Sequence, residues 1–534
     1  MASARVLLLA AASFVAAGCA SGASVTRPTA ASAAEGAPRE ELAWAPLSAE
    51  TFARAKREGK LVILDGSAAW CHWCHVMEAT TYHDPAVRAL LDRHFVAVKV
   101  DVDARPDLEE RYGDWGWPAT VVFSADATEL AKYRGYIEPA RFAELLRGLA
   151  EGARTGMAEA PLELGDARRP IGEEALAFVE RWVTAELADY YDEDEGGWGR
   201  TQKAPLGGNN AWLLSRARAD ARAREAALFT LDKQSKLVDP VWGGIYQYSA
   251  ARDWDHPHFE KLMTFQAPAL ENYAEAWALT RDPRHLARAR AMHGYMERFL
   301  RSPEGGFYAT QDADVNAHDR SRPFTSGHDY YALPEAARLA RGVPRIDTHV
   351  YARESGLGIA AYVVYARATG DGATLASAAR GASHVLATHR APGGGLAHDA
   401  RPDAKVLYAA DSAAMAMAYA RLHEATGERA HLDQAVELAG FLEAAMVDPA
   451  SGALFSSTED PDAAGVLARR RVAFEDNVLA LRAYARIARA TGDPRWPTAI
   501  RRILTGISTP AQIKARGRWL GDYLLALEET KGVR

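Results

Sequence analysis

The chain has few cysteines, only 3 among 534 residues. So few cysteines exclude a small scaffold held together by several disulfides. Long apolar runs are also lacking after the N-terminal segment, so we expect no membrane-spanning helix in the mature protein. Positive charge is not concentrated: the net charge is -7 and no block of Lys and Arg stands out. This distribution argues against nucleic acid as a partner.

The first cysteine, Cys19, ends a segment typical of a secretory signal. Arg5 supplies an early charge, an apolar core follows, and small residues precede the cysteine. The pattern resembles a bacterial lipoprotein signal, in which the cysteine is lipidated and becomes the new N-terminus. An ordinary signal peptide cut near Ala20 is the alternative. We expect a signal over 1–19, a flexible tether over 20–41, and a lipid anchor as the only contact with the membrane.

This signal predicts a location in the bacterial cell envelope. Ala20 rather than Asp follows the cysteine, which favours the outer membrane, with the protein facing the periplasm. A C-x-x-C pair in that compartment can be oxidised, reduced or cycled.

The other two cysteines, Cys71 and Cys74, form such a pair shortly after the apolar run 61–64. The order of strand, C-x-x-C and helix is typical of a thioredoxin-like fold. It places the first sulfur at a helix N-terminus, where free N–H groups and the helix dipole favour a thiolate. The pair therefore predicts a thiol–disulfide oxidoreductase with no cofactor beyond its own redox-active disulfide. Its partner would be a protein thiol, a protein disulfide or a reductase.

Within this motif we expect Cys71 to be the exposed nucleophile and Cys74 the resolving thiol. Trp70 would shield the pair, and His72 would help to hold Cys71 as a thiolate unless it is only a solvated surface histidine. His75 is more typical of a packing residue.

Two residues outside the motif complete the predicted redox site. Asp65 ends the preceding strand and can take a proton from the second cysteine, or is a strand-end acid without a role. Pro118 directly precedes an apolar strand and is the candidate for a cis-proline that faces the pair.

The same motif is compatible with two other functions, haem attachment and zinc binding. Cys71 to His75 reads C-x-x-C-H, the attachment pattern of c-type haem, but the strand before it favours the thioredoxin-like interpretation. Zinc held by Cys71, Cys74 and one histidine lacks a second C-x-x-C or H-x-x-H pair to complete it. We therefore predict no metal.

The chain divides by its hydrophobic patterns. Residues 42–152 alternate strand and helix patterns, 153–170 read as a linker, and 171–534 are dominated by helices. In the helical part, short turns such as Ala368-Thr369-Gly370-Asp371 alternate with Gly-rich loops such as Trp242-Gly243-Gly244. Such repeats indicate stacked helical hairpins. We predict a multidomain protein, an α/β thioredoxin-like domain followed by an all-α (α/α)6 toroid; an open solenoid is the alternative.

Several residues of the helical part are candidates for a second site. Paired acids or histidines beside aromatic platforms are what sugar chemistry requires. The candidates are His258, Glu260, Lys261, Asp312, Asp314 and Trp254. The alternatives are a buried network that holds hairpins in register, or a toroid that binds a sugar or a partner without catalysis.

Long motifs resemble a known family. The segments concerned are Trp70 to Glu78, Val98 to Asp101, Gly116-Trp117-Pro118, His256 to Lys261 and Ser302 to Tyr308. They are similar to the spermatogenesis-associated protein 20-like (DUF255) family. The resemblance implies a thioredoxin-like domain followed by an (α/α)6 toroid similar to N-acylglucosamine 2-epimerases and six-hairpin glycosidases. It leaves open a carbohydrate-active epimerase or glycosidase whose thioredoxin-like domain is mainly structural.

Overall fold

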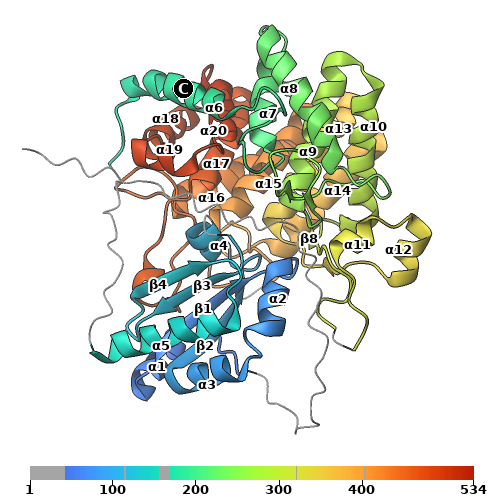
Figure 1. The fold of residues 1–534 in the computed structure, drawn as a ribbon. Helices are drawn as coiled ribbons and strands as arrows, with labels where there is room; N and C mark the ends of the chain where they lie inside the picture. Colours follow the sequence, from blue (N-terminus) through green and yellow to red (C-terminus); the bar gives the residue numbers. More distant parts are fainter. Residues whose placement is uncertain (1–41, 114–115, 156–168, 320, 402–403) are drawn as a thin grey trace, which may run out of the picture. The chain divides into compact units, whose positions relative to one another are not determined.

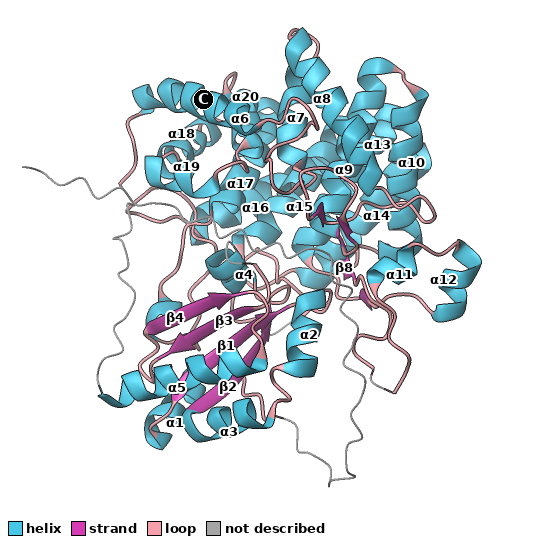
Figure 2. Cartoon of the chain, viewed as in Figure 1, coloured by secondary structure: helices cyan, strands magenta, loops and turns pink. Residues whose placement is uncertain are grey.

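The computed structural model describes residues 42–113, 116–155, 169–319, 321–401 and 404–534. The predicted signal and tether, with Cys19, and most of the predicted linker lie outside these residues. Ala43–Arg534 forms one compact unit. It begins with a mixed α/β region and continues into a mostly helical one (Figures 1 and 2).

The α/β region has the thioredoxin-like order predicted from the sequence. Its elements are α1 (Ala49–Glu58), β1 (Leu61–Ser67), α2 (His72–Thr80), α3 (Pro85–His94), β2 (Phe95–Asp101), α4 (Pro106–Tyr112), β3 (Ala119–Phe123), β4 (Glu129–Arg134) and α5 (Pro139–Thr155). The strand order is β2-β1-β3-β4. Strands β1 and β2 are parallel, whereas β3 is antiparallel to β1 and to β4.

Local sequence explains these elements. Ser48 caps α1 by accepting a hydrogen bond from the N–H of Thr51, and Asp84 caps α3 in the same manner. Strand β1 is buried along its whole length, as expected for an apolar central strand covered on both faces. Its core neighbours are Phe52, Val96, Val98, Val121 and Phe123.

The helical region is a closed double ring. Its long helices are α6 (Leu176–Tyr190), α7 (Gly207–Arg216), α8 (Ala221–Gln234), α9 (Met263–Thr280), α10 (Pro283–Tyr295), α13 (Ala352–Thr369), α14 (Gly372–His389), α15 (Ala409–Thr426), α16 (Arg429–Ala445), α17 (Phe474–Thr491), α18 (Arg495–Ile507) and α20 (Gly521–Thr530). The inner helices pack in the order α7, α9, α13, α15, α17, α20 and back to α7. In the same order, their outer partners are α8, α10, α14, α16, α18 and α6.

The packing of α20 against α7 closes the ring, so the toroid prediction is confirmed and the open solenoid is wrong. Short elements occupy the loops. They are α11 (Gly327–Tyr331), α12 (Glu335–Arg341), α19 (Pro510–Arg516), β5 (Tyr248–Ser249), β6 (Pro257–His258), β7 (Lys261–Leu262), β8 (Thr310–Gln311) and β9 (Ile346–Asp347).

The two recurrent glycine motifs have different structural roles. Gly370, Gly427 and Gly492 end α13, α15 and α17 in the left-handed conformation that glycine adopts at least cost. Gly243 belongs to a Gly-rich loop that runs from an outer to an inner helix. Its φ is +72°, and a Cβ there would meet the carbonyl oxygen of Ala291 at 2.1 Å, so no side chain fits.

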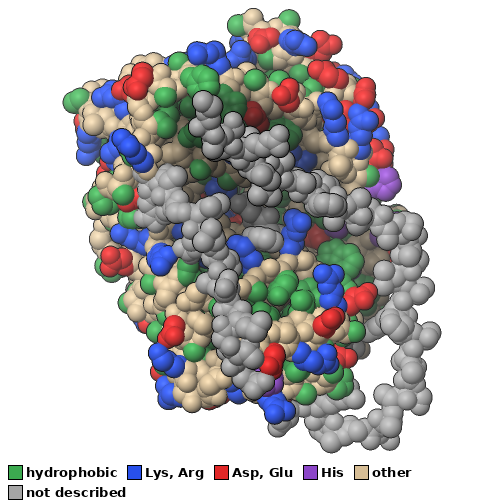
Figure 3. Space-filling view, turned by 60° about the vertical axis from the view of Figure 1, so that its left-hand side comes forward, with side chains coloured by type: hydrophobic (Ala, Val, Ile, Leu, Met, Phe, Trp, Pro, Cys, Tyr) green, Lys and Arg blue, Asp and Glu red, His purple; other side chains and the backbone are tan. Residues whose placement is uncertain are grey.

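Charge is mixed on the molecular surface. On the face drawn in Figure 3, acidic and basic side chains of the described residues are interspersed rather than gathered by sign. Among the described helices, none has the length and apolar character required to cross a membrane.

A buried ion network locks the loops of the toroid. Lys261 donates hydrogen bonds to Asp239 and to the carbonyl oxygen of Gly243, each at 2.8 Å, and Arg338 donates to Asp239 at 2.7 Å. The side chains of Lys261, Asp239 and Arg338 are 0% exposed. The ammonium also lies over the rings of Tyr246, Tyr295 and Tyr331. The network stabilises the loops only while both cations are present.

Replacing Lys261 by Met should destabilise the toroid by roughly 3 kcal/mol, because Asp239 stays buried with one partner fewer. Urea unfolding followed by tryptophan fluorescence measures this change. The matched control is Lys236→Met, which breaks an exposed pair with Asp255 and should cost under about 1 kcal/mol. Equal losses in the two variants would show that the buried network contributes little.

Candidate functional site

Cys71 and Cys74 are joined as a disulfide at the N-terminus of α2. Cys71 is the N-cap residue, and its sulfur accepts a hydrogen bond from the N–H of Cys74 at 3.2 Å. The strand β1 and helix α2 therefore present the pair as the sequence predicted.

The disulfide is buried between the two regions of the unit. Cys71 is 4% exposed and Cys74 is 6% exposed. They pack in a cluster with Trp70 and Val102 from the thioredoxin-like region and with Leu262 from the toroid. The prediction that Cys71 is freely exposed is therefore wrong, because the toroid covers the surface that the sequence alone leaves open.

The predicted neighbours of the pair have defined positions. The Trp117–Pro118 bond is cis, as expected. Trp70 packs in the disulfide cluster and donates its indole N–H to Asp103 at 2.8 Å, which fixes the ring.

A cavity of about 930 Å³ reaches the disulfide from the mouth of the toroid. The thioredoxin-like region contributes Trp70, Cys71, His72, Glu109 and Trp117 among others. The toroid contributes the first turns of inner helices, through Gly208 of α7, Thr264 of α9, Arg353 of α13, Asp476 of α17 and Asp522 of α20. The redox pair and the toroid mouth thus share one cavity.

His72 connects α2 directly to the toroid. Its Nδ1 donates to Oδ2 of Asp314 at 2.5 Å. Burial opposes charge on the ring, but the hydrogen bond and charge of Asp314, with the nearby acids Glu260 and Asp312, raise the pKa of His72. The raised pKa means that His72 holds its proton more tightly than a free imidazole does, and a charged ring beside Cys71 would favour a thiolate once the disulfide is reduced.

Two predicted toroid residues, His258 and Glu260, line the same cavity. His258 stacks on Tyr248 with ring centroids 4.1 Å apart. Burial, with the charge of His72, lowers the pKa of His258 to about 4. Burial raises the pKa of Glu260 to about 7, and the acids Asp312 and Asp314 add to this effect. A neutral imidazole and an acid that titrates near neutrality therefore face the cavity.

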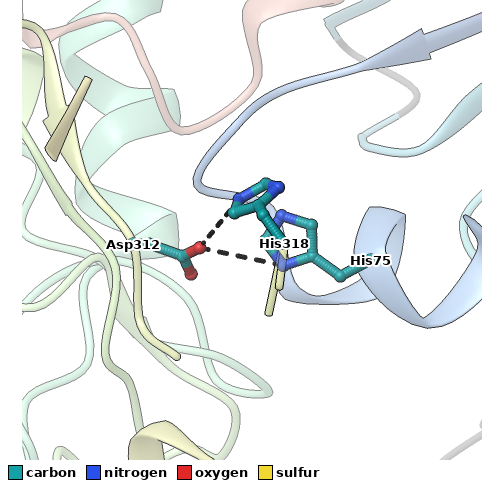
Figure 4. Close-up of side chains that lie close together, drawn as sticks. All are labelled: His75, Asp312 and His318. Atoms are coloured by element: carbon teal, nitrogen blue, oxygen red, sulfur yellow. Dashed lines mark ion pairs between the residues drawn. The ribbon is translucent and has the colours of Figure 1, made fainter. Parts of the chain in front are cut away.

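Asp312 and Asp314 follow strand β8 in the chain. Both make contacts beyond their own loop, so neither serves only to cap it. Asp314 accepts hydrogen bonds from His72 and from the N–H of Gly327, while Asp312 accepts from the N–H of Asp314. Asp312 also faces His75 and His318 (Figure 4).

Lys261 and Trp254 lie in the interior of the toroid. Lys261 belongs to the ion network described above, and Trp254 is 0% exposed with its indole N–H donating to the carbonyl oxygen of Glu195. Both positions agree with the alternative that this motif forms a buried network that holds the helical hairpins in register. Neither side chain has a free polar group for a substrate in this structure.

Asp65 is buried in β1, 4% exposed. Burial raises the pKa of its carboxyl to about 6, although the charge of Lys99 opposes the shift. A raised pKa makes the carboxylate a stronger base, which suits the predicted role of taking a proton from the second cysteine. That role remains a prediction.

Helix α4 holds the thioredoxin-like region on the toroid. Arg353 donates to Glu109 at 2.6 Å, and Arg471 pairs with Glu110 at 2.7 Å.

His398 is buried between the two regions. Its Nδ1–H donates to Asp411 and its Nε2–H donates to the carbonyl oxygen of Asp103. Although burial disfavours charge on the ring, Asp411 raises the pKa of His398.

Sequence reasoning missed Arg353, Glu109, His398 and His318. They are single charged or titratable residues outside any motif, so only the folded chain shows their importance. The candidates Asp312 and Asp314, a few residues before His318, were the sequence signal that lay near one of them.

The fold and site define a thioredoxin-like protein whose C-x-x-C pair faces a helical toroid. Residues 35–147 match the family model Thioredox_DsbH, described as "Protein of unknown function, DUF255". The chain is 28% identical to human spermatogenesis-associated protein 20 over 335 residues, which cover 55% of this chain and 42% of the human protein. The family resemblance seen in the sequence is therefore confirmed. The match spans less than half the length of that relative.

Each region also has a separate likeness. A segment of 105 residues is 36% identical to thiol:disulfide interchange protein DsbD 1 of Pseudomonas aeruginosa, covering 18% of each chain. The toroid resembles the crystal structure of a sugar epimerase from a ruminal bacterium. That likeness has a TM-score of 0.51 and 13% identity, and covers 67% of this chain and 99% of the epimerase. At this identity the likeness shows the fold alone.

Asp65 should make stability depend on pH. Burial raises its pKa from 3.8 to about 6, so the stability that the bound proton contributes is complete below 3.8 and lost as pH rises through 6. The free energy of unfolding should therefore fall by roughly 3 kcal/mol as the pH rises from 3.8 to above 6. In Asp65→Asn this part of the pH dependence should vanish, as urea unfolding of the oxidised protein at pH 4 and pH 8 would measure.

The control for this experiment is Asp126→Asn. Asp126 is exposed and pairs with Lys56, so its removal should leave the pH profile almost unchanged. A profile for Asp65→Asn that matches the wild type would contradict the assignment of this titration to Asp65.

Proposed function

We propose that this protein is a thiol–disulfide oxidoreductase whose substrate enters the cavity between the thioredoxin-like region and the toroid mouth. One observation carries the proposal: Cys71 lies on the wall of a cavity that both regions line. The similarity of one segment to a thiol:disulfide interchange protein supports the same chemistry.

The exchange follows from the positions of the two sulfurs. When the pair is reduced, the Cys71 thiolate attacks one sulfur of a substrate disulfide; a mixed disulfide forms and one substrate thiolate leaves. Cys74 then loses its proton and attacks the Cys71 sulfur, which releases the second substrate thiolate and re-forms the Cys71–Cys74 disulfide. Two electrons pass to the substrate, and a dithiol that can enter the cavity, either a small molecule or an extended segment of a reductase, must restore them. Run in reverse, the same steps oxidise a substrate dithiol.

Four residues assist in this scheme. His72, whose proton the contact with Asp314 helps to retain, stabilises the Cys71 thiolate, and Asp65 receives the proton of Cys74. Pro118 would shape the substrate groove, as predicted from the sequence, and Trp70, which packs against the pair, shields the disulfide from water.

Burial of the disulfide defines the substrate class. With Cys71 only 4% exposed, a substrate must pass through the cavity to reach the sulfur. A low-molecular-weight disulfide or an extended peptide segment meets this requirement, whereas a disulfide in a folded protein does not.

The proposed location is the bacterial envelope. Cys19 would carry the lipid anchor and the remaining two cysteines would act in a compartment where a C-x-x-C pair can cycle. Metabolic labelling with a lipid precursor tests this part separately.

Cys71→Ser should abolish exchange, lowering the rate by at least about 1,000-fold, because serine is a poor nucleophile toward disulfides. The assay follows the reduction of a small disulfide by the prereduced protein. The matched control is Cys19→Ser, which removes the third cysteine and should react as the wild type does. Unchanged exchange in Cys71→Ser would exclude the proposed function.

The direction of electron flow follows from the redox potential of the pair. Titration against defined thiol and disulfide buffers should give a reversible two-electron couple. A value near ~-270 mV would identify a reductase, and one near ~-120 mV an oxidase. Failure to titrate would leave the disulfide with a structural role only.

Access should make the protein selective for small substrates. A small disulfide should react at least tenfold faster than a folded protein disulfide. The folded substrate can reach Cys71 only if the contact between the two regions opens, and an opening cost of about 1.4 kcal/mol corresponds to a tenfold slower reaction. Parallel rates for the two substrate types measure this preference. The control is the urea-unfolded, prereduced protein, in which the preference should disappear; equal rates with the folded protein would contradict the buried site.

A carbohydrate-active protein is the second candidate, with a mainly structural thioredoxin-like region. It is favoured by the fold shared with a sugar epimerase and by His258 and Glu260 on the cavity wall. Titration with a panel of sugars, using Glu260→Gln as the matched variant, tests it. Binding that Glu260→Gln abolishes would support it, and the absence of binding would exclude it.

A further inference from the structure

Three side chains meet beside the redox helix without taking part in the exchange described above. His75 comes from α2, while Asp312 and His318 come from the toroid segment that follows β8 (Figure 4). Oδ2 of Asp312 lies 3.8 Å from Nδ1 of His75 and 3.3 Å from Nε2 of His318. The two imidazole rings are 4.2 Å apart between centroids.

Two of the polar atoms that converge here are buried and have no hydrogen-bond partner. They are Nδ1 of His75 and Oδ2 of Asp312. The His75 side chain is 9% exposed and that of Asp312 is 1% exposed. Burying Nδ1 of His75 without a partner costs about 1–3 kcal/mol, and Oδ2 of Asp312 has only its 3.3 Å ion pair with His318, so a ligand shared by the three side chains would offset this cost.

The remaining hydrogen bond of His75 fixes its orientation. Its Nε2 donates to the carbonyl oxygen of Ala69 at 3.1 Å. This bond leaves the lone pair of Nδ1 directed at Asp312. A histidine that ligates a metal almost always donates its other ring N–H to a carbonyl or carboxylate in this way.

We infer that His75, Asp312 and His318 bind a divalent transition-metal ion of the Zn²⁺ class. Ligand atoms about 2.1 Å from a tetrahedral ion lie ~3.4 Å apart, and the three candidate atoms lie within 4.8 Å of one another. Two imidazoles and one carboxylate favour Zn²⁺ or Fe²⁺ over Mg²⁺ and Ca²⁺. In binding, Nε2 of His318 exchanges its 2.9 Å contact with Ala69 for the metal, and the ring binds the ion as its Nδ1–H tautomer.

The ion would join the two regions next to the disulfide. His75 follows Cys74 directly, whereas Asp312 and His318 belong to the toroid. A metal held by all three therefore fixes the N-terminus of α2 at the toroid mouth. This site is distinct from the zinc alternative weighed in the sequence, since Cys71 and Cys74 are joined to each other and offer no thiolate.

The test is metal titration of the full-length, oxidised protein after treatment with a chelator and without reductant. Calorimetry with Zn²⁺ should show one site per chain, and Co²⁺ should give visible absorption bands of a low-symmetry site. Zn²⁺ should also raise the unfolding temperature, since it binds the folded state. Ca²⁺ should show no binding.

Two variants locate the site. Asp312→Asn and His318→Gln should each weaken Zn²⁺ binding by more than about 100-fold. His318 is partly exposed, so its replacement tests the site even if Asp312→Asn fails to fold. The control His256→Gln removes an exposed histidine that pairs with Asp253 and should bind as the wild type does.

A double variant, Cys71→Ser with Cys74→Ser, should retain the site. Loss of Zn²⁺ binding in this variant, binding unchanged in His318→Gln, or no stoichiometric Zn²⁺ in the wild type would each overturn the inference. None of these results depends on exchange activity, so they are separate from the tests of the proposed function.

Discussion

The contact between the N-terminus of α2 and the toroid mouth is the constraint on which the site depends. It buries the Cys71–Cys74 disulfide against Leu262 and sets His72 against Asp314 at 2.5 Å. An exposed C-x-x-C pair reacts with whatever thiol it meets, whereas a covered pair reacts only with what its cavity admits. In the proposed function the toroid is therefore part of the redox site rather than a separate attachment.

The electrostatics of this contact are cooperative. Burial opposes charge on His72, but the acids Asp314, Glu260 and Asp312 at the toroid mouth raise its pKa. Burial raises the pKa of Glu260 to about 7, and Asp312 and Asp314 add to this shift. Helix α4 adds the pair of Arg353 with Glu109 across the same boundary. Charges that would be costly when buried alone are stabilised because each region supplies partners for the other.

The two proposed chemistries differ in which half of the cavity they use. Thiol–disulfide exchange would use the wall lined by Cys71, His72 and Trp117, whereas sugar chemistry would use the wall lined by His258 and Glu260. The two walls are close enough for His72 to affect the pKa of His258. A ligand bound at one wall would therefore change the electrostatic environment of the other.

The sequence by itself determined the elements and their chemistry. The apolar run of β1, the C-x-x-C pair, the cis-proline position and the alternating glycine motifs are local signals, because backbone preferences and hydrophobic periodicity act over a few residues. Tertiary structure decided how far the disulfide is buried, that Lys261 and Trp254 lie in the interior, and that His75 meets His318. These features join residues far apart in the chain, and their energies depend on burial and pairing that no local pattern encodes.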